Sequence, residues 1–145
     1  MKKIVAAVDF SDSTPGVVEM ASAQATAFGA ELHLVHVLEP EPAYTAYGFT
    51  PDEFPAMHTF QEEARKRANS RLDEWVAKSP GAQSRLAEGS PLVAVLDYVK
   101  EIDADLVVLG SHGHGMVASL LLGSVAEGMV RKAIVPTLVV PAGEK

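Results

Sequence analysis

Residues 105–126 read DLVVLGSHGHGMVASLLLGSVA. Its first residues form a short apolar run, which is typical of a strand buried on both faces of a sheet. Glycines and histidines follow the run, and a helical pattern of apolar residues begins near Ser124. A buried strand that passes through a glycine-rich connection into a helix predicts an α/β fold with a parallel sheet.

Strand and helix patterns alternate along the rest of the chain. The further strand candidates are three apolar runs, Lys3–Asp9, Glu31–Leu38 and Pro136–Pro141, and a weaker stretch, Gln83–Ala87. Their alternation with helices predicts an open five-stranded parallel sheet with helices on both faces, of the Rossmann-like class. We expect the strand order 3-2-1-4-5 and a single domain over residues 1–145.

Three helices are expected before the one that begins near Ser124. The first has Thr14 as its N-cap, Pro15 as its first helical residue and Gly29 as its end. The third begins at Ser90-Pro91, which repeats the pattern of a cap followed by proline. The second is expected to bury one helical face, made of Phe60, Ala64, Ala68, Leu72, Trp75 and Val76. Residues 39–56 are rich in proline, acidic and aromatic residues, and we expect a mobile lid or a surface loop there.

The composition excludes several classes of function. Twelve basic and 19 acidic residues give a net charge of −7, which opposes binding to DNA, RNA or an anionic membrane surface. The absence of cysteine excludes disulfides, thiolate zinc sites and a cysteine nucleophile. The apolar run after Lys3 stops at Asp9, which is too short for the core of an export signal. We therefore expect a cytoplasmic protein without a nucleic acid or membrane partner.

Glycines and polar residues gather where the first and fourth strands end. In an open parallel sheet a ligand binds outside the carboxyl ends of the strands, at the point where the strand order reverses. With the expected order, this point lies between the strand that ends at Asp9 and the strand that ends at Gly110. Glycines let backbone amides approach an anion closely, and the helix that begins at Ser124 directs its positive end toward the same place. The alternative is that these glycines only turn the chain between strand and helix.

Other motifs for phosphate binding, metal binding or catalysis fit less well. Gly123-x4-Gly128 is followed by Met129 instead of the Lys-Ser/Thr of a Walker loop. His112 and His114 lack further metal ligands in the same element, so no metal site is predicted. The serine hydroxyls lack an identifiable base and orienting acid, so no catalytic residue is predicted.

The spacing Gly-x2-Gly-x9-Gly-Ser is present as Gly110, Gly113, Gly123 and Ser124. With the apolar runs at both ends of the chain, it resembles the universal stress protein family of the UspA type over nearly the whole length. The glycine spacing is that of the family's ATP-binding branch. The resemblance therefore implies an adenine nucleotide alpha hydrolase-like fold that binds ATP, ADP or AMP, with Mg²⁺ as a further candidate ligand.

The resemblance also implies roles for individual residues. Asp9 would accept a hydrogen bond from a ribose hydroxyl, and Val37 would pack against the base. The implied binding residues are Ala7, Val8, Asp9, Val37, Leu109, Gly110, Gly113, His114, Gly123, Ser124, Val125 and Ala126. His114 stands where many members have Lys or Arg, and no Lys or Arg occurs between Lys100 and Arg131. We therefore expect weaker binding of ATP when His114 is neutral, and a preference for AMP or ADP.

The resemblance further implies a homodimer in which the last strand, Thr137–Val140, pairs with its copy. The expected function is an adenine-nucleotide-binding sensor or regulatory module of the stress response, with an unidentified protein partner. Two alternatives are a slow ATPase or nucleotidyl transferase that uses Asp9 and Mg²⁺, and a nucleotide-free protein–protein adaptor.

Overall fold

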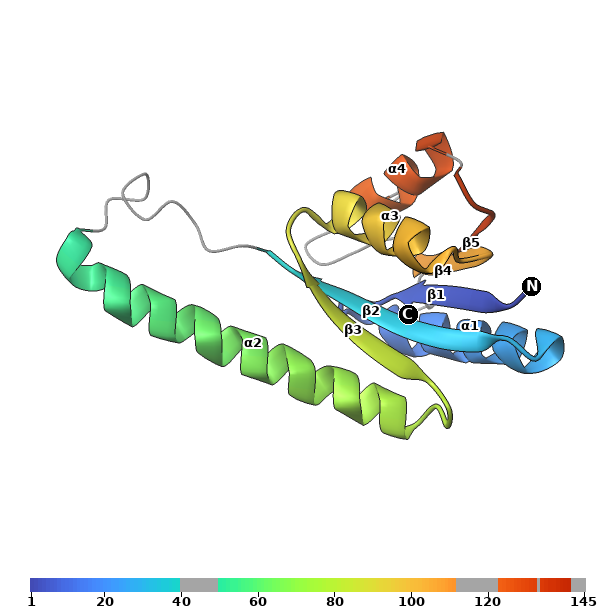
Figure 1. Ribbon diagram of the computed structural model, residues 1–145, viewed down its shortest axis with the longest axis horizontal. Coiled ribbons are helices and arrows are strands. Elements are labelled where there is room, and N and C mark those ends of the chain that lie inside the picture. The colour runs from blue at the N-terminus through green and yellow to red at the C-terminus, as the bar shows by residue number, and fades with distance from the viewer. Residues whose placement is uncertain (40–49, 112–122, 133, 142–145) are drawn as a thin grey trace.

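Strands and helices alternate along the chain, as Figure 1 shows for the computed structural model. The structure describes residues 1–39, 50–111, 123–132 and 134–141. The strands are β1 (Lys3–Ala7), β2 (Glu31–Leu38), β3 (Gln83–Glu88), β4 (Leu106–Gly110) and β5 (Thr137–Val140). The helices are α1 (Thr14–Phe28), α2 (Phe54–Ala77), α3 (Pro91–Ile102) and α4 (Ser124–Lys132), with a 3-10 helix, η2 (Pro51–Glu53), directly before α2.

The five strands form one parallel sheet in the order β3-β2-β1-β4-β5, which confirms the predicted order. β1 lies in the centre, where Ala6 is aligned with Leu34 of β2 on one side and with Val108 of β4 on the other. After β1, the chain adds β2 and then β3 on one side of β1. It then adds β4 and β5 on the other side of β1. The strand order therefore reverses between β1 and β4.

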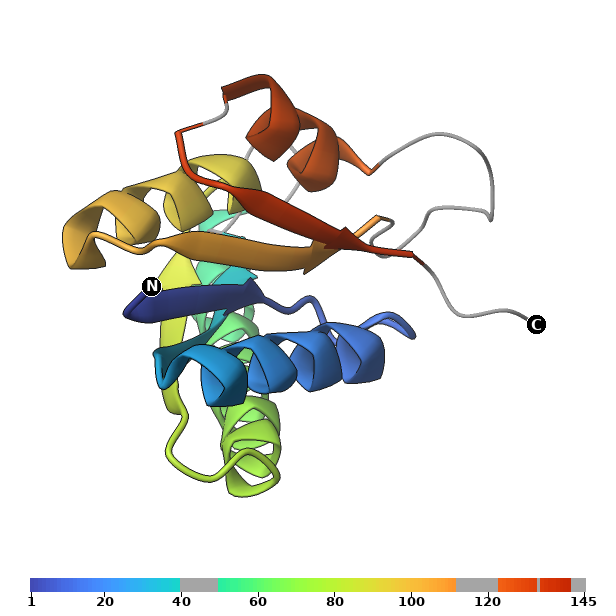
Figure 2. The ribbon, with the colours of Figure 1, turned by 90° about the vertical axis from the view of Figure 1, so that its right-hand side faces the viewer.

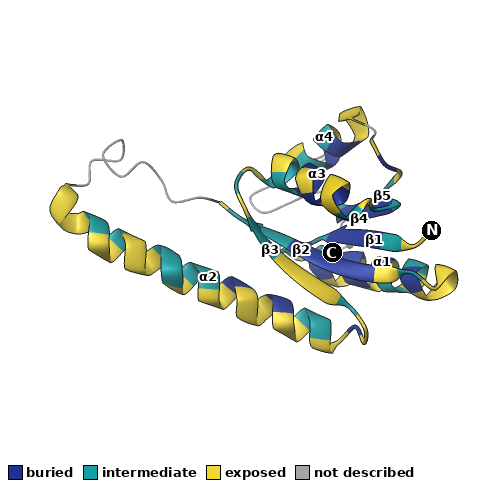
Figure 3. Ribbon diagram, in the orientation of Figure 1, coloured by how far each residue is buried: buried dark blue, intermediate teal, exposed yellow. Residues whose placement is uncertain are grey.

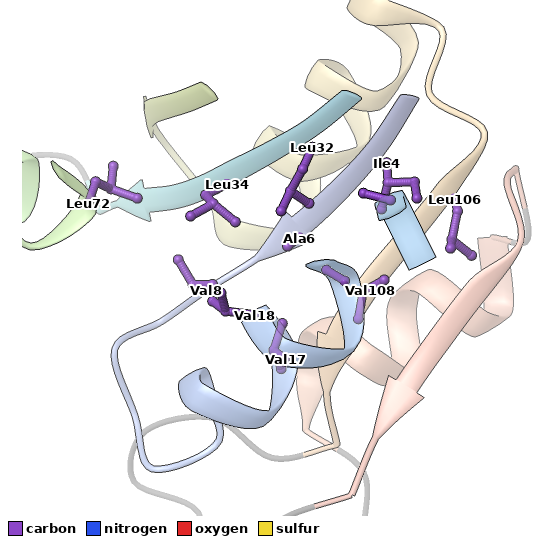
Figure 4. Packing of buried hydrophobic residues seen from close by; sticks show 12 residues of the cluster. Ile4, Ala6, Val8, Val17, Val18, Leu32, Leu34, Leu72, Leu106 and Val108 are labelled. Carbon is purple, nitrogen blue, oxygen red and sulfur yellow. The ribbon is translucent and has the colours of Figure 1, made fainter. Parts of the chain in front are cut away.

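Helices cover both faces of the sheet, with α1 and α2 on one face and α3 and α4 on the other (Figure 2). Because successive strand residues point to opposite faces, the buried side chains form two clusters. The first cluster, shown in Figure 4, joins Val17 of α1 and Leu72 of α2 to strand residues such as Ile4. The second joins Val95 of α3 and Met129 of α4 to the strand residues that point the other way.

The ends of α1 agree with the sequence except at its first residue. Ser13 occupies the N-cap position that was predicted for Thr14, and Thr14 is instead helical and 2% exposed. Gly29 ends the helix as predicted, because its φ of 63° lies in the left-handed region that glycine tolerates. Its backbone N–H donates to the carbonyl oxygens of Ala25 and Thr26.

Helix α2 begins earlier than predicted, and its first half extends beyond the sheet (Figures 1 and 3). The last part of segment 39–56 is therefore helical instead of a loop, while residues 40–49 lie outside the described residues. Phe60 was predicted to be buried, but it is 64% exposed because this part of the helix lies past the sheet. Ala68 and Leu72 are buried as predicted.

Leu72 is expected to hold α2 on the sheet, since its side chain is 1% exposed within the first cluster. Leu72→Ala should lower the free energy of unfolding by about 2–5 kcal/mol, because it removes buried contacts and leaves a cavity. Phe60→Ala, on the exposed half of the same helix, is the matched control and should change it by less than about 0.5 kcal/mol. Urea unfolding of both variants measures the difference, and equal effects would contradict this account of α2.

Candidate functional site

A cavity of about 380 Å³ lies at the carboxyl edge of the sheet, where β1 and β4 end side by side. The ends of β1, β2 and β4 and the first turns of α1, α3 and α4 form its walls. The lining residues are Ala7, Val8, Asp9, Ser13, Thr14, Val17, Val35, His36, Val37, Glu39, Pro91, Val95, Leu109, Gly110, Gly123, Ser124, Val125 and Ala126. The cavity thus opens at the reversal of strand order, and its volume falls in the range of roughly 300–1,000 Å³ that is typical of ligand pockets.

Most of the predicted binding residues lie together around this cavity. Ten of the twelve line it, namely Ala7, Val8, Asp9, Val37, Leu109, Gly110, Gly123, Ser124, Val125 and Ala126. The other two, Gly113 and His114, lie outside the described residues. The predicted set lacks the contributions of α1 and α3, including Ser13, Thr14 and Pro91. The βαβ order could have indicated them, because every helix that follows a parallel strand begins at the same edge of the sheet.

Asp9 follows β1, and its own backbone turn fixes its carboxylate. The Oδ1 atom accepts a hydrogen bond from the backbone N–H of Ser11 at 2.9 Å. The hydroxyls of Ser11 and Ser13 lie 2.9 Å apart and continue the turn toward α1. A half-buried carboxylate with one oxygen held in this way can accept a hydrogen bond from a ligand hydroxyl through its other oxygen.

Phe10, the residue after Asp9, has a left-handed backbone that side chains contributed by β2 and α2 hold in place. Its φ is 61°, which is strained for an aromatic residue by about 1–3 kcal/mol. The Phe10 ring stacks on the His36 ring with centroids 4.2 Å apart, and the Arg71 guanidinium lies 4.6 Å from the centroid of the Phe10 ring. These contacts from two separate elements fix the connection that carries Asp9.

His36 also holds the end of β1 directly. Its Nδ1 atom lies 2.8 Å from the carbonyl oxygen of Val8. Because a carbonyl oxygen can only accept, Nδ1 carries the proton and donates it. This hydrogen bond fixes the carbonyl of Val8, which lines the cavity and precedes Asp9 in the chain.

The first turn of α4 supplies donors on the opposite side of the cavity. The first helical hydrogen bond of α4 runs from the N–H of Glu127 to the carbonyl oxygen of Gly123 at 2.9 Å. The backbone N–H groups of Ser124, Val125 and Ala126 precede it and have no acceptor within the helix. The N–H of Gly123 already donates to Ser111 at 2.7 Å, so its role is to hold the start of the helix. The α4 amides and the positive end of the helix therefore suit an anionic group.

The charges around the cavity are acidic. Asp9 and Glu39 are both among its lining residues, and no Lys or Arg is among the described ones. Within the described ranges, no group of three or more His, Cys, Asp or Glu residues is arranged to hold a metal ion. The described lining residues therefore offer an anionic ligand backbone N–H groups and side-chain hydroxyls, with no Lys or Arg among them.

A helix that spans a bilayer needs about 20 consecutive, mostly apolar residues. None of the helices in the described ranges is long and apolar enough to span a membrane.

The fold and the cavity define a doubly wound α/β protein with a ligand site at its reversal of strand order. The sequence model of the universal stress protein family matches residues 1–141. The chain therefore belongs to the universal stress protein family.

Individual members of the family resemble the chain over nearly its whole length. A Thermus aquaticus protein, the universal stress protein in QAH/OAS sulfhydrylase 3'region, is 35% identical over 145 residues, which cover 96% of this chain and 98% of the relative. A universal stress protein solved in complex with cAMP has a TM-score of 0.63 at 27% identity and covers 98% of both chains. The universal stress protein from Archaeoglobus fulgidus in complex with dAMP has a TM-score of 0.63 at 25% identity, and the match covers 96% of this chain and 97% of that one.

The hydrogen bond from His36 to Val8 predicts a specific loss of stability. His36→Phe keeps an aromatic ring against Phe10 but removes the donor, and it should lower the free energy of unfolding by about 1 kcal/mol. His58→Phe is the matched control, because the His58 side chain is 63% exposed on α2. Urea unfolding of the two variants tests the difference, and an unchanged stability of His36→Phe would count against this hydrogen bond.

Proposed function

We propose that this cavity binds adenine nucleotides and that the protein acts in the cytoplasm as a nucleotide-dependent sensor or regulatory module of a stress response. The observation that carries the proposal is that ten residues, predicted from the sequence to bind nucleotide, line a single cavity. Two related structures of the same fold are complexes with cAMP and dAMP, which supports an adenine nucleotide as the class of ligand.

The walls of the cavity divide in a way that suits the three parts of a nucleotide. The half-buried side chains of Ala7 and Val37 supply an apolar surface on which a base can pack. Asp9 supplies an acceptor for a sugar hydroxyl. The first-turn amides of α4, which begins at Ser124, supply donors and a positive helix end for phosphate. The base, sugar and phosphate would then lie in sequence across the carboxyl edge of the sheet.

The charge of the cavity favours nucleotides that carry few phosphates. Asp9 and Glu39 repel added negative charge, and the described lining residues include no basic side chain. We therefore propose that AMP binds more tightly than ADP and that ATP binds most weakly. Mg²⁺ would narrow this difference, because it neutralises part of the charge of a triphosphate.

The last strand supports the proposal of a homodimer. β5 pairs with β4 from Val107↔Thr137 to Gly110↔Val140, and in the described part of the chain its other edge carries no strand. All four of its residues are half-buried. An edge strand of this kind can pair with a second copy of itself across a twofold axis.

The nucleotide proposal is tested with a pair of variants that change the charge of the protein equally. Asp9→Asn weakens a charged hydrogen bond to a sugar hydroxyl, so it should weaken adenosine binding by about tenfold, or about 1.4 kcal/mol. Asp12→Asn, on the exposed side of the same connection, should leave the affinity within about twofold of the wild type. Titration calorimetry on nucleotide-free protein measures both.

Adenosine is the probe for these variants because it has no phosphate that the lost charge could affect. AMP, ADP and ATP are then titrated into the wild type to establish their order of affinity. Equal effects of the two substitutions would contradict the role of Asp9. A wild type that binds no adenosine or adenine nucleotide would contradict the proposal itself and favour the adaptor alternative.

The homodimer proposal has a separate test. Light scattering coupled to gel filtration is expected to give about twice the chain mass of 15.4 kDa at micromolar concentration. A mass of one chain throughout that range would contradict pairing through β5.

A further inference from the structure

Among the described residues, Thr14 has the one buried side-chain polar atom that makes no hydrogen bond. Thr14 is 2% exposed, lies at the start of α1 and lines the cavity. A buried hydroxyl without a partner is unfavourable, because it gives up its hydrogen bonds to water and gains none in the protein. A ligand that enters the cavity can supply the missing partner.

Thr14 and the backbone amides proposed to bind phosphate belong to helices on opposite faces of the sheet. Thr14 belongs to α1, whereas Ser124 begins α4 on the other face (Figure 2). Asp9 lies on the same β1–α1 connection as Thr14 and carries a negative charge that repels phosphate. The part of a nucleotide that suits this side of the cavity is therefore its neutral sugar, which bears hydroxyls.

We propose that Thr14 is a specificity-determining residue that hydrogen-bonds the ribose of the nucleotide and selects ribonucleotides over deoxyribonucleotides. The inference rests on the proposed function, since it names the part of an adenine nucleotide that the α1 side of the cavity recognises. Thr14 Oγ1 donates its proton to a ribose hydroxyl oxygen, and the ribose in turn donates to the Asp9 carboxylate. The order of donors follows from the chemistry, because a carboxylate only accepts whereas a hydroxyl both donates and accepts.

The test compares three ligands with three forms of the full chain. AMP, 2′-deoxy-AMP and 3′-deoxy-AMP are titrated into the wild type, Thr14→Val and Thr14→Ser. Valine has the shape of threonine without the hydroxyl, and serine keeps the hydroxyl. The wild type should bind AMP about three- to tenfold more tightly than at least one deoxy analogue, which is the range for one neutral hydrogen bond. Thr14→Val should bind AMP about three- to tenfold more weakly and lose that preference, and Thr14→Ser should retain it.

A second measurement uses the protein without nucleotide. Thr14→Val removes a buried polar group that has no partner, so its urea midpoint should lie above that of the wild type. A hydroxyl that already has a partner inside the protein, such as a buried water, gives the opposite result. The same substitution is thus expected to raise stability and to lower affinity, which a purely structural role for Thr14 does not produce.

The outcomes separate this inference from the function on which it rests. If the wild type binds AMP and Thr14→Val keeps both the affinity and the preference for ribose, the Thr14 inference is overturned and nucleotide binding stands. Equal affinity of the wild type for all three ligands, or a lower urea midpoint of Thr14→Val, also overturns it. If the wild type binds none of the three ligands, both the inference and the proposed function fail.

Discussion

The parallel pairing of β1 with β4 determines where the two halves of the sheet meet and where the cavity forms. It aligns Ile4 with Leu106, Val5 with Val107 and Ala6 with Val108, and each of these residues is at most 7% exposed. The pairing joins the half of the sheet made by β1, β2 and β3 to the half made by β4 and β5. Because all strands are parallel, it also brings the carboxyl ends of both halves to one edge. The turns and helix starts that follow those ends then surround a single cavity.

Some residues at this edge of the sheet have features that lower the stability of the fold. The two buried clusters on the faces of the sheet must offset this loss. Phe10 has a strained backbone, and Thr14 has a buried hydroxyl without a partner. Asp9 and Glu39 add negative charge to the lining of the cavity. Strained backbone, unpaired buried polar groups and clustered like charges are typical of functional sites. Elsewhere in a protein, residues that favour stability are retained. The two buried clusters on the faces of the sheet show no comparable feature among their described members.

The sequence predicted those parts of the structure that depend on local patterns. Short apolar runs and the alternation of strands with helices predicted a parallel sheet, and the order expected for it placed the glycines at the ends of the first and fourth strands. The exposure of Phe60 could not be predicted, because periodicity shows which face of α2 is apolar but not where the sheet beneath it ends. The left-handed backbone of Phe10 also has no local signal, since it depends on His36 from β2 and Arg71 from α2. Thr14 carried the signal of a helix start, but its burial follows from the packing of α1 on the sheet.

We propose that an adenine nucleotide binds at the carboxyl edge between β1 and β4. The most direct measurement is the change in backbone amide chemical shifts when AMP is added to uniformly ¹⁵N-labelled protein. If the proposed site is right, the largest changes fall on the connection from Val8 to Thr14 and on the first turn of α4, from Ser124 to Ala126, while Phe60 is unaffected. Changes centred on α2, or none at saturating AMP, would contradict it.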